Sequence, residues 1–370
     1  MKQGWEYKKL GEVCEIYQPR TLSTDMLTKT GGYPVYGANG IIGYYNQYNH
    51  EEQEVLLTCR GATCGTVNIS KPYSWINGNA MVIHRKSEEM DFNFLKYLML
   101  SLDYSLIITG AAQPQITRQK LAPTKIGIPP KSTQLSIVSE LDKINELIRL
   151  KKEQLKDFDN LAQSIFYEMF GDPVENEKGW KVKKLKDIVS ENCSISYGIV
   201  QPGENVENGV PVVRPVDMNG TFIFRQGLKN TTKEISDSYK RTILKGNEIL
   251  MCVRGTTGVI TMATSDLKDC NVTRGITPIE CGPACNRYFL YYQILSPNVQ
   301  YYIKEHTRGI ALKQINMKDV REIPLFLPPL PLQHLFAQRI EQIERQKSAV
   351  QKSITDLETL LASRMQYWFE

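Results

Sequence analysis

Histidine is scarce in this sequence, with four residues among 370. Because histidine is the commonest general acid or base in enzymes, we expect no acid–base catalytic group. Long apolar runs are lacking too: no window approaches about 18 consecutive apolar residues, and the N-terminal stretch MKQGWEYKKL has no apolar segment of an export signal. These absences predict a protein that is neither membrane-bound nor exported, and hence cytoplasmic.

Motifs of nucleotide-dependent enzymes are also missing. The sequence has no Gly-Lys-Ser/Thr phosphate loop for ATP and no Gly-x-Gly turn opening a helix for S-adenosylmethionine. Both Pro-Pro pairs follow an aliphatic residue, Ile128 or Leu327, and so depart from the Asn-Pro-Pro-Tyr or Asp-Pro-Pro-Tyr motif of adenine methylation. We therefore expect no catalytic residue and no cofactor on this chain.

The cysteine residues and the net charge exclude few further classes of protein or site. The eight cysteines include two close pairs, Cys59/Cys64 and Cys281/Cys285, but no histidine lies near either pair. A structural zinc site usually needs two tight Cys/His pairs, so we predict ordinary buried thiols and no metal, with zinc as the less favoured alternative. The net charge of +5 is too small to indicate nucleic-acid binding by itself.

What the sequence does contain is a long internal repeat. Residues 110–144 and 309–343 align without a gap, at an offset of 199 residues, and the matched pairs are Gly110/Gly309, Gln115/Gln314, Ile116/Ile315, Pro129/Pro328, Pro130/Pro329 and Gln134/Gln333. Near the start of each copy, Gly4-Trp5 is echoed by Gly179-Trp180 at an offset of 175, so the second copy is 24 residues longer. Two copies of one module, with variable segments between shared positions, suit a duplicated scaffold with two specificities.

Each copy predicts a globular domain followed by a long helix. Residues 54–59, 80–83 and 248–253 have the apolar pattern of short strands, and Phe92–Ser101 and Arg287–Leu295 that of short helices. The fold class is therefore α/β in the broad sense (α+β), without a regular βαβ alternation. The expected boundaries are domain 1 at residues 1–130, helix 1 at 131–171, a linker at 172–178, domain 2 at 179–329 and helix 2 at 330–370.

The two long helices carry an apolar seam with a 3.5-residue repeat, which predicts a coiled coil. Its residues are Ile137, Leu141, Ile144, Ile148, Leu155 and Phe158 in the first helix, and Ile340, Ile343, Val350, Ile354, Leu357 and Leu361 in the second. Lys151 and Lys347 interrupt the seam, either to set the register or with their ammonium groups turned to solvent. The alternative, a helix lying on its own domain, is less favoured because about 37 residues at 1.5 Å each make a rod of about 55 Å. The short linker requires the second helix to run back, giving an antiparallel pair and a pseudo-twofold internal repeat.

This arrangement resembles a type I restriction–modification specificity subunit. The resemblance covers essentially the whole chain, and its specific features are two variable modules, Gly-x-x-x-x-Gln-Ile before each long helix and Pro-Pro-x-x-x-Gln at its start. It implies two target recognition domains, each contacting one half of a split sequence in duplex DNA, with the coiled coil fixing the spacer. It also implies two methyltransferase subunits and, through them, restriction/translocase subunits as partners, which carry S-adenosylmethionine, Mg and ATP. The chain itself would be non-catalytic.

Polar residues on exposed loops are then candidates for DNA contact, since Arg suits guanine, Asn and Gln suit adenine, and Lys, Arg, Ser and Thr suit phosphates. In the first module they are Tyr36, Asn39, Arg60, Thr63, Asn77, Asn79, Gln113, Gln115 and Arg118. In the second they are Arg214 (with Asp217 nearby), Arg254, Thr256, Thr257, Asn271, Arg274, Lys313, Gln314 and Asn316.

Each candidate has a structural alternative. The alternative for Asn77 is a turn residue that does not contact DNA, and that for Arg60 is an ion pair with a carboxylate. Tyr36 is better suited to the hydrophobic core than to a DNA-binding groove. Gln115 and Gln314 keep their identity while their neighbours diverge, which favours a shared structural or phosphate-binding role. Two other functions are also compatible with the sequence: a coiled-coil adaptor that does not bind DNA, and the DNA-recognition part of a larger restriction enzyme.

Overall fold

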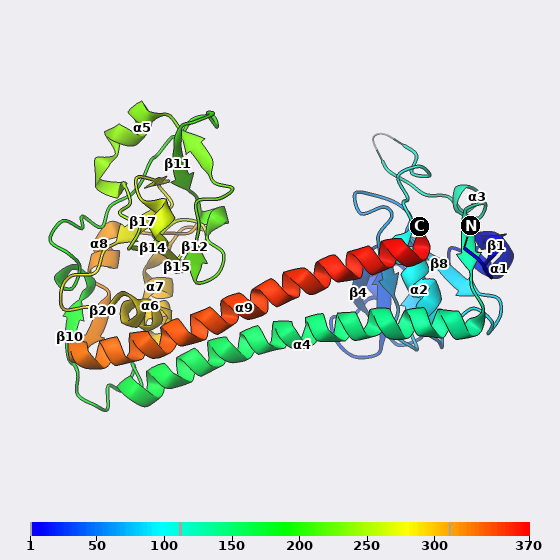
Figure 1. The fold of residues 1–370 in the computed structure, drawn as a ribbon, viewed down its shortest axis with the longest axis horizontal. Coiled ribbons are helices and arrows are strands. Elements are labelled where there is room, and N and C mark those ends of the chain that lie inside the picture. Colours follow the sequence, from blue (N-terminus) through cyan, green and yellow to red (C-terminus); the bar gives the residue numbers. More distant parts are fainter. Residues whose placement is uncertain (1, 111–112, 311) are drawn as a thin grey trace. The chain divides into compact units, whose positions relative to one another are not determined.

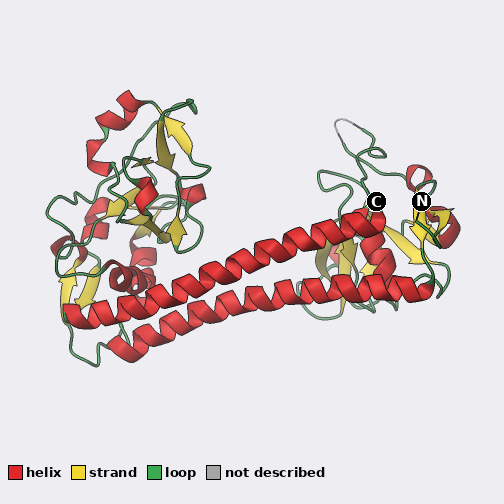
Figure 2. Cartoon of the chain, in the orientation of Figure 1, coloured by secondary structure: helices red, strands yellow, loops and turns green. Residues whose placement is uncertain are grey.

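The computed structural model describes residues 2–110, 113–310 and 312–370. Contacts divide the chain into two compact units: unit 1 comprises Met1–Lys152 and Lys352–Glu370, and unit 2 comprises Glu153–Gln351. Each unit holds one module, the start of that module's long helix and the end of the other module's long helix (Figures 1 and 2). The units thus differ from the predicted segments, because each combines residues from both copies of the repeat.

Unit 1 contains short strands and short helices, together with the start of one long helix and the end of the other. Its elements are β1 (Glu6–Lys9), α1 (Leu10–Val13), β2 (Cys14–Tyr17), η1 (Thr24–Met26), β3 (Tyr33–Gly37), β4 (Gly40–Tyr45), β5 (Val55–Thr58), β6 (Val67–Ile69), β7 (Trp75–Ile76), β8 (Ala80–Arg85), α2 (Phe92–Ser101), α3 (Arg118–Leu121), β9 (Lys125–Ile128) and the start of α4 (Lys131–Phe170). They form three sheets, ordered β2-β8-β5-β6, β4-β3-β7 and β1-β9.

Unit 2 follows the same plan with additional elements. They are β10 (Lys181–Lys184), η2 (Leu185–Asp187), β11 (Val210–Val213), η3 (Pro215–Asp217), β12 (Phe222–Ile223), β13 (Lys229–Thr231), α5 (Lys233–Ser238), η4 (Lys240–Thr242), β14 (Ile249–Cys252), β15 (Ile260–Ala263), η5 (Ser265–Leu267), β16 (Asn271–Val272), β17 (Ile276–Ile279), α6 (Arg287–Leu295), α7 (Pro297–His306), β18 (Thr307–Arg308), β19 (Gln314–Ile315), α8 (Met317–Arg321), β20 (Pro324–Leu327) and the start of α9 (Leu330–Phe369). The sheets are β12-β15-β14-β17, β13-β11-β16, β10-β20 and β18-β19.

The predicted short elements are confirmed. The strands appear as β5, β8 and β14, and α2 and α6 have the predicted bounds. Both short helices begin at a residue whose side chain caps the helix: Asp91 accepts hydrogen bonds from the backbone N–H groups of Asn93 and Phe94, and Asn286 does the same for Tyr288 and Phe289. Such caps satisfy N–H groups that a helix leaves without partners, so the local sequence determines where these helices start.

The three-stranded sheets give the two modules a common framework. In unit 1, β3 runs parallel to β7 with Tyr36 opposite Ile76, and in unit 2, β11 runs parallel to β16 with Val213 opposite Val272. The four-stranded sheets differ at both edges, because β2 extends the sheet beyond β8 in unit 1, whereas β12 extends it on the opposite side, beyond β15, in unit 2. The additional residues of the second module therefore form elements around a framework that both modules share.

The hydrophobic cores show how the long helices belong to both modules. In unit 1, Leu361 and Met365 of α9 pack against the core that contains Ile137 and Leu141 of α4. In unit 2, Phe166 of α4 is only 2% exposed and lies in one core with the start of α9. Each globular core is thus completed by the end of the helix that follows the other module.

Within each unit α4 and α9 run in opposite directions. In unit 1, Glu140 bonds Trp368, and Lys152 pairs with Glu358. In unit 2, Asp159 pairs with Lys347, and the rings of Phe166 and Phe336 are 5.6 Å apart. As the residue number rises along α4, that of its partner on α9 falls.

The predicted seam residues are placed differently along the helices. Four of them, Ile137, Leu141, Ile340 and Ile343, lie in the globular cores, because the start of each helix passes over its own domain. The same cores also contain residues of the other long helix, namely Leu361 beside Ile137 and Leu141, and Phe166 beside Ile340 and Ile343. Ile144, Ile148, Val350 and Ile354 are buried, and Leu155, Phe158, Leu357 and Leu361 are half-buried. Within the described residues, no helix combines the length and the apolar character needed to cross a membrane.

Candidate nucleic-acid interface

An arginine-glycine turn follows the central strand of each unit. In unit 1, β5 leads through the buried Cys59 to the exposed Arg60, and Gly61 has a φ of +89°. In unit 2, β14 leads to Arg254, and Gly255 has a φ of +85°. Since this left-handed conformation is readily accessible only to glycine, the turn needs Gly at both places. The sequence thereby places an arginine at the end of a buried strand in each unit, exposed in the case of Arg60 and half-buried in the case of Arg254.

The segment before each long helix is fastened to this turn by backbone hydrogen bonds. In unit 1, Gly61 N donates to Pro114 O at 3.0 Å, and Ile116 N donates to Cys59 O at 3.0 Å. In unit 2, Gly255 N donates to Lys313 O at 2.8 Å, and Ile315 N to Val253 O at 3.0 Å. The predicted candidates therefore come together as Arg60, Thr63, Gln113 and Gln115 in unit 1, and as Arg254, Thr256, Thr257, Lys313 and Gln314 in unit 2.

Two more predicted residues of unit 1 lie beside this turn. The hydroxyl of Thr58 donates to the carbonyl of Ala38, which brings the exposed Asn39 to the end of β5. Cys59 Sγ donates to the carbonyl of the exposed Asn79 at 3.2 Å. The three loops that carry Asn39, Arg60 and Asn79 thus meet at one end of the sheets.

In unit 2 the corresponding place is more basic. Gly275 lies between two loops, since a Cβ added to it would be 2.7 Å from Pro215 Cγ and 3.6 Å from Arg254 O. Arg214 precedes Pro215 and Arg274 precedes Gly275, so three arginines lie on adjoining loops. Among the described residues no ion pair involves Arg254 or Arg274, nor Arg60 of unit 1, and the proposed carboxylate partner of Arg60 is thus not present. Arg214 differs: its guanidinium binds Asp217, which raises the pKa of Arg214.

Three predicted DNA contacts are contradicted by burial. Asn77 is 3% exposed; its Oδ1 accepts from Leu22 N at 2.7 Å, so it is the turn residue of the alternative interpretation. Asn271 is fully buried and its Oδ1 accepts from the hydroxyl of Thr242 at 2.7 Å. Tyr36 is 5% exposed, with its hydroxyl accepting from Lys71 N. Buried amides bonded in this way organise loops and are not free to contact a base.

The remaining candidates lie at the starts of short helices or beside the turns. Arg118 is the first residue of α3 and Asn316 precedes α8; both are exposed. The backbones of Gln115 and Gln314 form bridges to Arg60 and Arg254, and Gln314 Nε2 donates to Tyr197 Oη at 3.2 Å. The side-chain bond favours a structural role for Gln314, whereas the side chain of Gln115 is exposed.

The prediction missed two polar side chains at these sites. Besides Tyr197, Gln18 of unit 1 donates from Nε2 to Gly78 O at 2.8 Å and to Cys59 Sγ at 3.1 Å. Neither Gln18 nor Tyr197 lies on a glycine-rich turn or at a position shared by the two copies. The sequence therefore gave no signal that could have found them.

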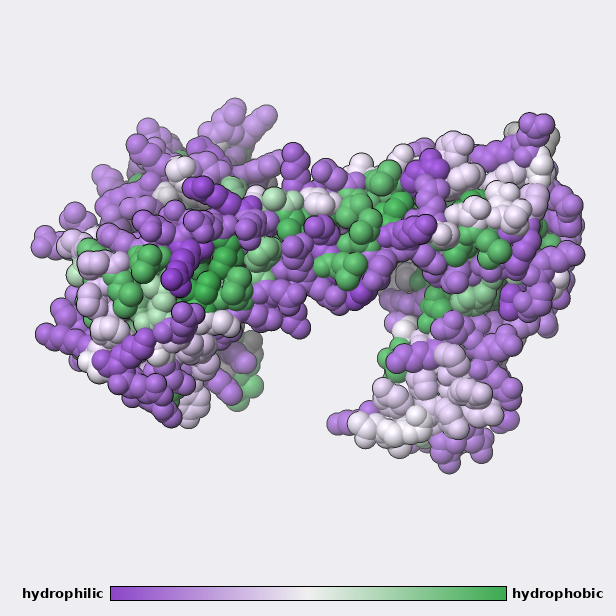
Figure 3. Space-filling model, turned by 60° about the horizontal axis from the view of Figure 1, so that its bottom comes forward, coloured by the Kyte–Doolittle hydropathy of each residue, from purple (hydrophilic) through white to green (hydrophobic). Residues whose placement is uncertain are grey.

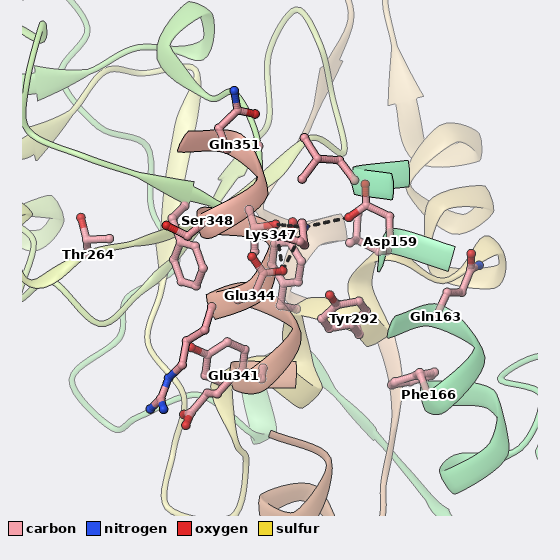
Figure 4. A pocket seen from close by; sticks show the side chains of 18 of the residues that line it. Asp159, Gln163, Phe166, Thr264, Tyr292, Glu341, Glu344, Lys347, Ser348 and Gln351 are labelled. Carbon is pink, nitrogen blue, oxygen red and sulfur yellow. Dashed lines mark hydrogen bonds and ion pairs between the residues drawn. The ribbon is translucent and has the colours of Figure 1, made fainter. Parts of the chain in front are cut away.

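A cavity of about 1050 Å³ lies in unit 2 between α4, α6 and α9 (Figure 4). At its centre Lys347 Nζ binds Asp159 Oδ1 at 2.8 Å and Glu344 Oε1 at 3.0 Å, with Tyr292 alongside. Burial alone would lower the pKa of Lys347, but the two carboxylates raise it above its ordinary value. Lys347 is thus a buried ion-pairing group between the helices and does not turn to solvent.

Metal-binding groups and disulfides do not contribute to these sites. In the described part of the chain, His, Cys, Asp and Glu side chains form no group of three that could hold a metal ion. All eight cysteines are free; five are buried, and Cys64, Cys193 and Cys281 are half-buried. The chemistry that the exposed loops offer is hydrogen bonding and positive charge.

Comparison with known proteins gives consistent matches. The family model described as "Type I restriction modification DNA specificity domain" matches residues 2–157 and 177–359. The chain is similar to the EcoBI specificity subunit of Escherichia coli, with 27% identity over 180 residues, which covers 48% of this chain but only 37% of that protein. It is 22% identical over 351 residues to a putative type I specificity subunit of Mycoplasma pneumoniae, covering 90% of this chain and 88% of the relative.

Solved structures share the fold at low sequence identity. The type I S subunit of M. genitalium superposes with a TM-score of 0.58 at 14% identity, covering 100% of this chain and 98% of that one. A chain from a structural study of complex assembly and conformational transition of the type I R-M system gives 0.59 at 19% identity, covering 99% and 97%. These likenesses extend over both modules and both long helices.

Proposed function

Because the chain belongs to the type I restriction modification DNA specificity domain family, we propose that it supplies the DNA sequence specificity of a type I restriction–modification complex. Each unit would contact one half of a bipartite target in duplex DNA. The observation that carries the proposal is the repeated turn: Arg60 and Arg254 stand at the same place on the same framework, while the loops around them differ. Identical supports with different contact residues suit two half-sites of different sequence.

The long helices would fix the unread spacer between the half-sites. In support, α4 and α9 run in opposite directions in both units, and each helix contributes to both globular cores. An antiparallel coiled coil with pseudo-twofold symmetry would present the two units to the two halves of the target in equivalent ways. Duplex DNA has the matching twofold symmetry of its backbone.

We further propose that the long helices hold two methyltransferase subunits, which bring in the restriction/translocase subunits. Leucines remain exposed on the helices, namely Leu135, Leu147, Leu150 and Leu360 in unit 1 and Leu161 and Leu335 in unit 2. Figure 3 shows hydrophobic side chains gathered along part of the helices on the face drawn. Methylation and ATP-dependent cleavage, with S-adenosylmethionine, Mg and ATP, would reside on those partners in the cytoplasm, and this chain would be non-catalytic.

The test is co-expression of the chain with its methyltransferase, followed by sequencing of methylated adenines in the host genome. We expect one bipartite motif with a fixed spacer, and binding of that duplex by the purified complex that weakens steeply with salt. Arg60→Ala should affect one half-site and Arg254→Ala only the other. A complex that binds the target no better than heparin, and leaves no bipartite motif, would instead identify the chain as an adaptor.

A further inference from the structure

The residue at the C-terminal end of the central strand of the three-stranded sheet differs between the units. In unit 1, Tyr36 O accepts from Asn77 N at 3.0 Å; at the equivalent place in unit 2, Val213 O accepts from Thr273 N at 2.9 Å. The next residue is Gly37 in unit 1 but Arg214 in unit 2. One framework position thus carries a guanidinium in one unit and no side chain in the other.

Asp217 holds this guanidinium in one orientation. Arg214 Nε donates to Asp217 Oδ2 at 2.9 Å, and Nη2 donates to Oδ1 at 2.6 Å. The same carboxylate accepts from the backbone N of Arg214 at 2.8 Å, and Pro215 fixes the chain between them. The side chains of Arg214 and Asp217 are 30% and 14% exposed. The pair is therefore rigid and still reachable from solvent.

The carboxylate occupies one edge of the guanidinium and leaves another available. A guanidinium has five N–H donors in a planar fork. Asp217 takes the Nε–H and one N–H of Nη2, so the edge formed by Nη1 and the second N–H of Nη2 retains two parallel donors. This is the geometry that a pair of acceptors on one flat edge requires.

We propose that Arg214 recognises a guanine in the major groove through this edge, and that Asp217 is the positioning residue that orients it. The inference rests on the proposed function and names the base that unit 2 contacts at this point. Guanine offers two acceptors, O6 and N7, on its major-groove edge, whereas adenine has a donor beside N7, thymine has a single acceptor and cytosine a donor. Only guanine accepts both donors.

A phosphate is the weaker candidate for the same edge. The charge of Arg214 is balanced by Asp217, so a phosphate gains little attraction from the pair, while a neutral base edge is unaffected. Arg254 and Arg274, on the adjoining loops, carry no ion pair within the described residues and suit phosphates better. Restricting the side chain before binding also lowers the entropy cost of making two hydrogen bonds.

The experiment uses the full chain in complex with its methyltransferase, and compares the methylated motif of the wild type with those of Asp217→Asn and Arg214→Ala. Asn at 217 can still accept from the backbone N of Arg214, so the loop is preserved while the fixed bidentate clamp is lost. The wild-type motif should contain a guanine in one half-site. Asp217→Asn should relax that one letter, lowering discrimination about tenfold or more, and Arg214→Ala should abolish the preference for guanine there.

The matched control is Glu88→Gln in unit 1, which removes the ion-pair partner of Arg85 at the same i,i+3 spacing; Arg85 and Glu88 are 2.8 Å apart. It should leave both half-sites unchanged, and thermal melting should be similar for all variants. A motif without a G·C base pair in either half-site overturns the inference. So does an Asp217→Asn variant with unchanged letters, or an Arg214→Ala variant that weakens binding to all duplexes equally and reduces the salt dependence. These results leave the proposed function standing, whereas a wild-type complex with no bipartite motif removes both.

Discussion

Gln134 ties the start of a long helix to the start of a short one: its Oε1 accepts a hydrogen bond from the backbone N–H of Asp91 at 2.8 Å. Its Nε2 donates to Glu89 O and Pro129 O, and the side chain is 1% exposed. In unit 2, Gln333 makes the same set of bonds around Asn286, with Oε1 accepting from its N–H at 2.7 Å. The glutamine of the repeated Pro-Pro-x-x-x-Gln motif thus forms a structural joint: its side-chain hydrogen bonds connect the start of α4 to the start of α2, and the start of α9 to the start of α6.

Replacing Gln134 or Gln333 by Met keeps the volume but removes these hydrogen bonds. A buried donor or acceptor left without a partner costs about 1–3 kcal/mol, so we expect each variant to lose stability in that range. Urea unfolding measures the loss, and hydrogen exchange should rise first at α2 or α6 respectively. Gln338→Met, at an exposed position of α9, is the control. Equal stability of Gln134→Met and Gln338→Met would contradict the stabilising role of the hydrogen bonds made by Gln134.

Phe166 belongs to the first copy of the repeat in sequence but to unit 2 in structure. Its ring lies 5.0 Å from Phe170 and 5.9 Å from Phe289, centroid to centroid. Phe166→Ala should therefore destabilise unit 2 by about 3–5 kcal/mol. Hydrogen exchange should accelerate in α6 and β20 and stay unchanged in β5 and β8. Leu161 is exposed on the same helix, so Leu161→Ala should have little effect. Faster hydrogen exchange confined to unit 1 would show that the end of α4 does not stabilise the core of unit 2.

His50 makes the stability of unit 1 dependent on pH. Its Nδ1 faces Asn49 Oδ1 at 2.6 Å and its Nε2 faces Tyr17 Oη at 2.9 Å. Burial, aided by the nearby His84, lowers the pKa of His50 to about 4, whereas burial raises the pKa of Tyr17 to about 12, so the phenol remains the donor. Because the unfolded state takes up the proton more readily, the contribution of His50 is present above about pH 6.5 and declines towards pH 4.

Thermal melting between pH 7 and pH 4 checks this expectation. His50→Gln, which cannot take up a proton, should flatten the decline in this range. The exposed His334 serves as the control, and His334→Gln should keep the wild-type pH profile. Identical profiles for all three proteins would show that His50 titrates no differently in the folded and unfolded states.

The proposed spacer role predicts the effect of lengthening the helices. Four residues inserted in α4 between Leu150 and Asp157, matched by four in α9 after Lys352, add about 6 Å. At about 3.4 Å per base pair the spacer should widen by one or two pairs, with both half-sites unchanged. Sequencing of methylated adenines measures this directly. Altered half-site bases with an unchanged spacer would contradict the proposal that the long helices set the spacer and the globular parts recognise the half-sites.

Local pattern predicted the elements well but not the environment of single side chains. The bounds of α2 and α6 follow from neighbouring residues, because Asp91 and Asn286 cap the helices that they precede. The burial of Asn77 and Asn271 depends on Leu22 and Thr242, which are distant in sequence, and a turn-forming Asn looks the same whether buried or exposed. The Arg-Gly turns were found because a buried strand followed by Gly is itself a local signal.

By itself the sequence determined that the chain is a duplicated module with two long amphipathic helices, since periodicity and repetition are properties of residue order. Only the tertiary structure decided which helix end completes which core, that Gln134 and Gln333 are joints, and that Asp217 orients Arg214. These depend on contacts between residues brought together by packing. The free energy of burying Phe166 or satisfying a buried amide is gained only when those distant partners meet.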